Sequence, residues 1–386
     1  MTAVSYQMSV PMSSGEIRVT DPQRGIEIEA KHHRVAEFLD AQEFDALLLR
    51  SPQNFAWFTT GGNCLRGMSH EGTAALFLTR EARVVICSNV DSGQLFDREL
   101  YGLGFQLKER PWYESRDVLV EDICRGRNVA GDTAFANTAN VSDQLVELRQ
   151  PLSDFESQRL RELGVQVSHA VEATCRHLQL GQTEAEIAGE LAHRLLKHGI
   201  EPEILQVLAD GQGHRYRHWS YGEDTVQRYA VVSAVGRRLG LSVGATRTMA
   251  FGEPSRDVRQ AHHLALMIEA TAAHFSQANW SLAETWPRVQ RIFEKFNGEE
   301  EWQLASQGDV IGYHPSEVPI TPQCTFDIKP GTAIWWHPSV GPAMVGDTIL
   351  VNQHSFEIVT PSEEWPMIRV DVKGMPYLFP DILPRE

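Results

Sequence analysis

The chain contains few cysteines, no long apolar segment and no excess of positive charge. The five cysteines among its 386 residues are an odd number, and no two have the C-x-x-C spacing. The sequence therefore indicates neither a disulfide framework nor a zinc site. No stretch approaches ~20 apolar residues, so no transmembrane helix is predicted. The net charge of −16 disfavours nucleic acid and anionic membranes as partners, because both require a basic surface.

Signals for export and for nucleotide binding are also missing. Residues 1–20 have neither a basic start nor an apolar run of signal-peptide length, so we expect a cytoplasmic protein. No G-x-G-x-x-G or phosphate-loop string occurs, which leaves nucleotide binding without support. Ser233 and His218 would be candidates for a serine–histidine dyad, but a serine within a predicted strand is usually structural.

The length and the apolar pattern predict a leader followed by two domains. Residues 1–28 are expected to be an extended leader, residues 29–150 an α/β domain and residues 151–386 a second domain. In the first domain a helix is predicted over about 30–42. Short apolar runs bounded by polar turns are typical of strands, and three follow this helix, at 44–50, 73–80 and 83–89.

The second domain is predicted to begin with two capped helices. Ser153 or Asp154 can cap the first, and Thr183 with Glu186 has the capping-box spacing at the start of the second. Strands are expected near 204–209, 229–235, 241–251, 324–336 and 347–359, with helices over about 256–277 and 284–296. This order favours an α+β fold with helices on one face of an antiparallel sheet.

Several short strings give the chain a family resemblance over roughly residues 30–360. They are T-R-T at 246–248, I-K-P-G at 328–331, G-D-T-I-L-V at 346–351, L-R-x-x-x-S-x-x-E at 148–156 and G-Q-T-E-A-E-I at 181–187. In this order they resemble the superfamily of creatinase, aminopeptidase P, prolidase and methionine aminopeptidase. The resemblance implies a pita-bread second domain after a smaller creatinase-type α/β domain. It also implies a homodimer in which one N-terminal domain covers the partner's pocket.

The resemblance implies that the metal site of these peptidases has been lost. In the family, two Asp, one His and two Glu hold a pair of divalent metals. The matching positions here are Ser233, Gly244, Asp309, Lys329 and Gly346. Two divalent cations within ~4 Å of each other need several carboxylates to offset their repulsion, and only Asp309 supplies one. We therefore expect no metal and no other cofactor.

Lys329 has three interpretations. Its ammonium can pair with Asp309 and fill the former site, a pair that gains ~4 kcal/mol at ~4 Å before desolvation. It can instead bind an anion or a carbonyl group, or act as a base whose pKa is lowered by burial. If the alignment is displaced, it lies on the surface.

The creatinase branch of the family works without metal, using a histidine and glutamates on a guanidino C–N bond. His218 falls where that histidine would lie, and His214 is a competing assignment. The two glutamates are replaced by Thr246 and Lys329, which disfavours creatine as a substrate. An anionic ligand would suit Lys329 and Arg247, although Arg247 could equally be a structural strut.

Further candidates lie close in sequence to the former ligands. Alternation along a strand sends only one of Trp335 and Trp336 into a pocket. We predict His218, Lys329 and Asp309 as catalytic residues, and as pocket-lining residues His214, Arg247, Tyr313, His314, Trp336 and His337. The favoured function is binding of a small molecule or peptide in the former active-site cleft. The alternatives are a metal-independent hydrolase of a C–N bond in a small substrate and, last, an Xaa-Pro metalloaminopeptidase.

Overall fold

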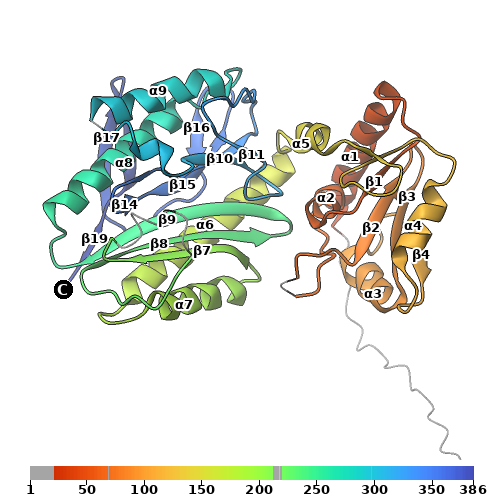
Figure 1. Ribbon diagram of the computed structural model, residues 1–386, viewed down its shortest axis with the longest axis horizontal. Coiled ribbons are helices and arrows are strands. Elements are labelled where there is room, and N and C mark those ends of the chain that lie inside the picture. Colours follow the sequence, from red (N-terminus) through yellow and green to blue (C-terminus); the bar gives the residue numbers. More distant parts are fainter. Residues whose placement is uncertain (1–20, 68, 212–216, 218–219, 297) are drawn as a thin grey trace, which may run out of the picture.

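The computed structural model describes residues 21–67, 69–211, 217, 220–296 and 298–386. Two parts are visible in Figure 1, an N-terminal one that contains β1–β4 and a larger one that contains the rest of the chain after α5. His214 and His218 lie outside the described residues. Within the described part of the chain, no helix is both long and apolar enough to cross a membrane.

The N-terminal part is a six-stranded mixed sheet with the order β4-β3-β2-β1-β5-β6. β1 is parallel to β5, β3 is parallel to β4, and β2 is antiparallel to both of its neighbours. The strands are β1 (Ala46–Leu49), β2 (Ala74–Leu78), β3 (Arg83–Ser88), β4 (Gln106–Arg110), β5 (Val129–Gly131) and β6 (Ala139–Asn140). The helices are α1 (Pro22–Ala41), α2 (Pro52–Phe58), α3 (Asn89–Gln94), α4 (Arg116–Cys124) and α5 (Ser142–Arg149), with a π-helical turn at Leu95–Glu99.

The first helix begins earlier than the sequence pattern predicts. Asp21 is its N-cap, and its side chain accepts hydrogen bonds from the amides of Gln23 and Arg24. Pro22 occupies the first helical position, where its missing N–H costs nothing. Residues 22–28, which were expected to belong to the leader, are therefore helical.

The larger part has a nine-stranded sheet whose main order is β11-β10-β12-β15-β9-β8-β7, with β16 beside β15 and β19 beside β9. Its strands are β7 (Glu201–Ala209), β8 (Tyr229–Arg238), β9 (Leu241–Phe251), β10 (Gly308–Ile311), β11 (Val318–Pro319), β12 (Ala333–Trp336), β15 (Gly346–Val351), β16 (Phe356–Ile358) and β19 (Leu383–Arg385). Two small hairpins accompany it, β13 (Ser339–Val340) with β14 (Ala343–Met344) and β17 (Met367–Val372) with β18 (Met375–Pro380).

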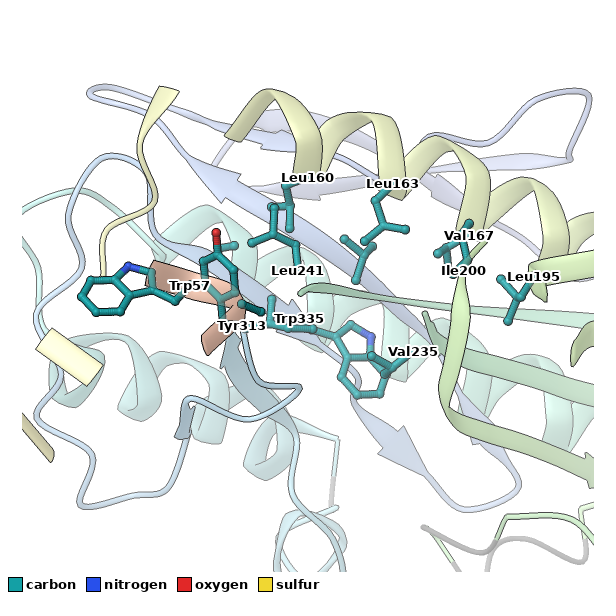
Figure 2. Close-up of a cluster of buried hydrophobic side chains, with 14 of the residues drawn as sticks. Trp57, Leu160, Leu163, Val167, Leu195, Ile200, Val235, Leu241, Tyr313 and Trp335 are labelled. Carbon is teal, nitrogen blue, oxygen red and sulfur yellow. The ribbon is translucent and has the colours of Figure 1, made fainter. Parts of the chain in front are cut away.

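Helices cover one face of this sheet, which confirms the predicted α+β class. They are α6 (Asp154–His177), α7 (Glu184–Lys197), α8 (Arg256–Phe275) and α9 (Leu282–Lys295), with a 3-10 turn at Glu301–Gln303. The predicted capping box at Thr183–Glu186 is present, and Ser153, one of the two predicted caps of α6, forms a capping box with Glu156. In Figure 2, Leu160, Leu163 and Val167 of α6 line up along the sheet beside Leu241.

The register of the strands divides the central side chains between the two faces. Ser233 pairs with Thr246, Thr246 with Gly346, Thr348 with Trp335, and Trp335 with Asp309. Residues directly opposite one another point to the same side of a sheet. These side chains therefore share what we call the cleft face, and the residues between them point to the helix face.

Candidate functional site

The former ligand positions on the strands meet on the cleft face. Ser233 Oγ is 2.8 Å from Thr246 Oγ1. The amide of Gly244 donates to Thr348 Oγ1 at 3.0 Å, and that hydroxyl donates to the Gly244 carbonyl at 2.8 Å. The structure thus brings the predicted positions together, but it satisfies their polar groups with one another.

Trp335 occupies the space above Gly244. A Cβ built on Gly244 would lie 2.4 Å from Cε2 and 2.5 Å from Cδ2 of the indole. Trp335 is only 4% exposed, and Figure 2 shows its ring beside Val235, the residue that pairs with Gly244. An aspartate at position 244 would require this indole to move.

Trp336 was predicted to line the pocket, and this prediction is wrong. The strand sends Trp335 to the cleft face and Trp336 to the helix face, where the indole N–H of Trp336 donates to Ser276 Oγ at 3.1 Å. Its ring packs against Gly308, where an added Cβ would lie 2.5 Å from Cε3. The expectation that only one of the two tryptophans faces the cleft was correct. Which of them does so is set by the pairing of β12 with its neighbouring strands.

Asp309 pairs with a histidine and not with the predicted lysine. His337 Nε2 lies 2.8 Å from Asp309 Oδ2, and Ser316 Oγ donates to Oδ1 at 2.5 Å. The imidazole of His337 packs against Trp335, with ring centroids 4.2 Å apart. Asp309 and His337 were both predicted at the site, and the contact between them joins β10 to the residue that follows β12.

Lys329 does not enter the former metal site. The residue is exposed, in the turn before β12, where its amide donates to Thr332 Oγ1 at 3.1 Å. No ion pair links it to Asp309, whose carboxylate is held by His337 and Ser316. Of its three interpretations, the surface position is the one that the structure supports, because the ladder that places the cleft residues begins only at Ala333.

Arg247 is a strut on the helix face and does not line the cleft. Its Nε lies 3.2 Å from Glu172 of α6, and its Nη1 lies 2.9 Å from Asp347 of β15. It also donates to the carbonyls of Thr246 and Thr360. These contacts tie α6 to the centre of the sheet, so the structural alternative for this residue is confirmed.

Tyr313 and His314 also lie outside the cleft lining. The hydroxyl of Tyr313 donates to Glu156 Oε1 at 2.7 Å, in a buried cluster between α1 and α6. His314 Nδ1 lies 2.7 Å from the Ser316 carbonyl oxygen in the turn after β10. The neighbouring Pro315 and Ser316 line the cleft instead.

The cleft itself has a volume of about 880 Å³ between α7, β7, β10 and β12. Its polar lining includes Glu203, Gln206, Asp309, Ser316 and His337, together with the ring of Trp335. The lining formed by the described residues contains no lysine or arginine. The expected preference for an anionic ligand, which rested on Lys329 and Arg247, is therefore not supported.

Glu203 and Gln206 were missed because β7 carries no string that marks a site. Glu203 accepts a 2.5 Å hydrogen bond from Ser242 and lies 3.4 Å from Arg237. Burial raises the pKa of Glu203 above its usual value, although Ser242 and Arg237 oppose the shift. Ser242 stands in the string G-L-S-V-G, but it lies within β9 and not at the strand-to-helix turn that a hydrolase nucleophile requires.

A pair of metal ions does not fit these residues. The described part of the chain contains no group of three or more histidine, cysteine, aspartate or glutamate side chains arranged to hold a metal. Asp309 and His337 come closest, and they bind each other. Gly346 offers no carboxylate, and a Cβ there would lie 3.0 Å from the carbonyl oxygen of Trp336.

Comparison with known proteins identifies relatives over most of the chain. The family model for metallopeptidase family M24 matches residues 158–353, just over half of the chain. An uncharacterised peptidase, SH1217 of Staphylococcus haemolyticus, is 20% identical over 354 residues, which cover 86% of this chain and 99% of the relative.

Two solved structures show how widely the fold is used. The prolidase from Pyrococcus horikoshii OT3 superposes with a TM-score of 0.75 at 16% identity, covering 86% of this chain and 99% of the prolidase. The N-terminal domain of the FACT complex subunit SPT16 from Cicer arietinum gives a TM-score of 0.66 at 10% identity, covering 88% and 96%. At these identities the likeness shows the pita-bread fold alone, and activity has to be argued from the site.

Proposed function

The chain belongs to metallopeptidase family M24, and we propose that it is a member whose cleft binds a small molecule or peptide without the metal pair that the family name implies. The observation that carries this proposal is the indole of Trp335 above Gly244. Cβ atoms in real proteins essentially never approach another heavy atom within 3.0 Å, and this one would stand at 2.4 Å. The indole lines the cleft, so an aspartate at position 244 would have to displace the ring into the space that a ligand would occupy.

The charges of the cleft support the same conclusion. A metal pair needs carboxylates that are free to coordinate it. Of the carboxylates in the described lining, Asp309 is held by His337 and Ser316, and Glu203 is held by Ser242 and Arg237. Metal binding would have to break these contacts before it formed any of its own.

The remaining features of the cleft suit a ligand. Small-molecule sites are usually clefts of ~300–1,000 Å³ with a few polar groups on a mainly apolar lining, and this cleft has about 880 Å³. Trp335 and Pro319 supply apolar surface, while Gln206 supplies an amide that can both donate and accept hydrogen bonds. Uncharged or dipolar ligands, including short peptides, match this lining.

Metal content and peptide binding test the proposal together. In full-length protein purified without chelator, elemental mass spectrometry should find below about a tenth of an equivalent of transition metal. Xaa-Pro dipeptides should bind without being hydrolysed when manganese or cobalt is added. About two equivalents of metal per chain, with metal-dependent hydrolysis of the dipeptides, would show that the chain is an ordinary metallopeptidase of this family.

A second candidate function is metal-independent hydrolysis of a C–N bond. The 2.8 Å contact between Asp309 and His337 favours it, because a carboxylate that orients an imidazole is a common arrangement for general acid–base catalysis. This candidate predicts turnover that persists in the presence of a chelator and disappears in His337→Gln. Under pure binding, the same variant should change affinity alone.

The predicted cytoplasmic location and homodimer stay predictions. Sedimentation equilibrium of the full chain would test the second, with a mass near twice 43.4 kDa expected for the homodimer.

A further inference from the structure

A second cavity, of about 800 Å³, lies in the N-terminal part of the molecule. Its wall is formed by the residues that end or follow three strands of the first sheet, namely Arg50 after β1, Ser88 at the end of β3 and Thr133 after β5. Arg66 and residues 70–73, together with Trp112, residues 114–115 and the first two residues of α4, complete it. Ligands of open α/β sheets bind outside the carboxyl ends of the strands, and this cavity occupies that position.

Most of the charges around this cavity are already paired. Arg66 is bidentate to Asp91, at 2.7 and 2.8 Å. Arg50 is 2.7 Å from Asp117, and its guanidinium lies over the ring of Phe135. Glu114 is 2.9 Å from Arg110. Of the lining carboxylates that leaves Glu71, which is exposed to solvent.

Arg116 differs from Arg50 and Arg66, the other two arginines that line the cavity. Its Nη1 donates to the Gly72 carbonyl at 2.9 Å, but no carboxylate of the described residues lies at salt-bridge distance. The side chain is half-buried, and burial, followed by the neighbouring Arg50, lowers the pKa of its guanidinium below the usual value. A guanidinium has five N–H donors in a planar fork that matches carboxylate and phosphate groups, so most of this fork is available.

We propose that this cavity binds the phosphate or carboxylate group of a small molecule, with Arg116 as the anchor and Arg50 as a second positive charge. An anion here would give the Arg116 guanidinium the ion-pair partner that Arg50 already has in Asp117. Trp112 at the rim is 68% exposed and offers a flat apolar surface to the remainder of the ligand. The site is separate from the cleft and does not depend on its function.

Calorimetric titration of the full-length protein at low ionic strength tests the site, with inorganic phosphate and succinate as probes. At least one probe should bind saturably, and the stronger of the two identifies the source of the oxyanion. Arg116→Gln should weaken binding by at least about tenfold, as expected for loss of a charge-assisted hydrogen-bonding pair. Arg125→Gln, which removes a surface arginine that is 79% exposed, is the matched control and should bind as the wild type does.

A second variant decides the matter if Arg116→Gln does not fold. Asp117→Asn removes the carboxylate that competes for Arg50 and leaves Arg116 in place, so it should tighten binding. The proposal is overturned if neither probe binds saturably, if Arg116→Gln binds as tightly as the wild type, or if Asp117→Asn has unchanged affinity.

Discussion

At the scale of single residues, the proposed absence of a metal pair rests on the contact between Gly244 and Trp335. Gly244→Asp should destabilise the protein, because its Cβ would overlap the indole at 2.4 Å and overpacking of a core costs ~1–3 kcal/mol. Trp335→Ala should also destabilise, by ~3–5 kcal/mol through the cavity that it leaves.

The double variant gives the sharper test. If the two residues compete for one space, Gly244→Asp should cost less in the Trp335→Ala background than in the wild type. Urea denaturation of the four proteins measures this coupling. Additive costs would mean that the aspartate side chain avoids the indole and that the steric argument against metal is incorrect.

These residues also show how far the sequence could predict the site. Ser233, Gly244, Asp309 and Gly346 lie on one face of the sheet, and flanking strings fix the strand positions of Gly244 and Gly346. The side chain that fills the space beside Gly244 could not be predicted, since it depends on which of two adjacent tryptophans faces the cleft. Lys329 was misplaced because a string match gives position along the chain but not the direction of a side chain in a turn.

Glu269 is a buried carboxyl for which the described residues provide no side-chain hydrogen-bond partner, and its burial leads to a prediction about pH. It is 2% exposed, and burial, followed by the nearby Asp347, raises its pKa well above the usual 4.5. The folded state therefore favours the protonated form of this carboxyl more strongly than the unfolded chain does. Its contribution to stability is complete below the unfolded pKa and is lost as pH rises towards the folded pKa.

Glu269→Gln should remove the loss of stability that wild type suffers as pH rises, because glutamine does not ionise. The free energy of unfolding of the variant should improve relative to wild type as pH rises from 5 upward, by up to about 1.4 kcal/mol per pH unit for one group. Urea denaturation from pH 5 to pH 9 measures it, with Glu162→Gln on the exposed face of α6 as the control. A constant difference across this range would contradict a raised pKa of Glu269.

At the scale of elements, α6 approaches the chain after β16 so closely that only glycine fits. A Cβ on Gly164 would lie 1.9 Å from the carbonyl oxygen of Val359. Gly189, in the middle of α7, has nothing within 4 Å of its Cβ position. The two glycines have the same helical propensity and differ in what surrounds them.

Alanine at these two positions should therefore have opposite effects. Gly189→Ala should stabilise by ~0.5–1 kcal/mol through helix propensity. Gly164→Ala should destabilise by more than that gain, because backbone atoms have to separate to admit the methyl group. Thermal denaturation of both variants measures the signs, and stabilisation by Gly164→Ala would contradict the packing of α6 on this segment.

The helices of the larger part were predictable to a useful degree, and for a physical reason. The N-cap at Ser153 and the capping box at Thr183 are local interactions that can be predicted directly from the sequence. The start of α1 was misjudged by several residues, since its cap is the single side chain of Asp21 followed by a proline. The order of the strands in the sheet could not be predicted from the sequence, because strands that are far apart in the chain, such as β9 and β15, lie side by side.

At the scale of the whole molecule, a buried charged cluster joins the two parts of the chain. Lys31 of α1 is fully buried, and its Nζ lies 2.6 Å from Glu156 Oε1 in the first turn of α6. The same ammonium donates to the Trp57 carbonyl at 2.6 Å and to Thr60 Oγ1 at 3.1 Å. Tyr313, from the loop after β10, donates to the same carboxylate. One cluster thus connects α1, α2, α6 and the rim of the sheet across the proposed boundary at residue 150.

Lys31→Met should consequently destabilise the whole chain and not the N-terminal part alone. Removing one partner of a buried pair leaves an uncompensated charge and costs ~3–5 kcal/mol, whereas an exposed pair is worth ~0–1 kcal/mol. Asp40→Asn, which breaks the exposed contact with Arg80, is the matched control. Urea denaturation followed by fluorescence and by circular dichroism should show one cooperative transition at lower urea for Lys31→Met and little change for Asp40→Asn.

If Lys31→Met instead separates unfolding into two transitions, the cluster is the contact that makes the two parts fold as one unit. Unchanged stability would mean that the ammonium and the carboxylate do not depend on each other.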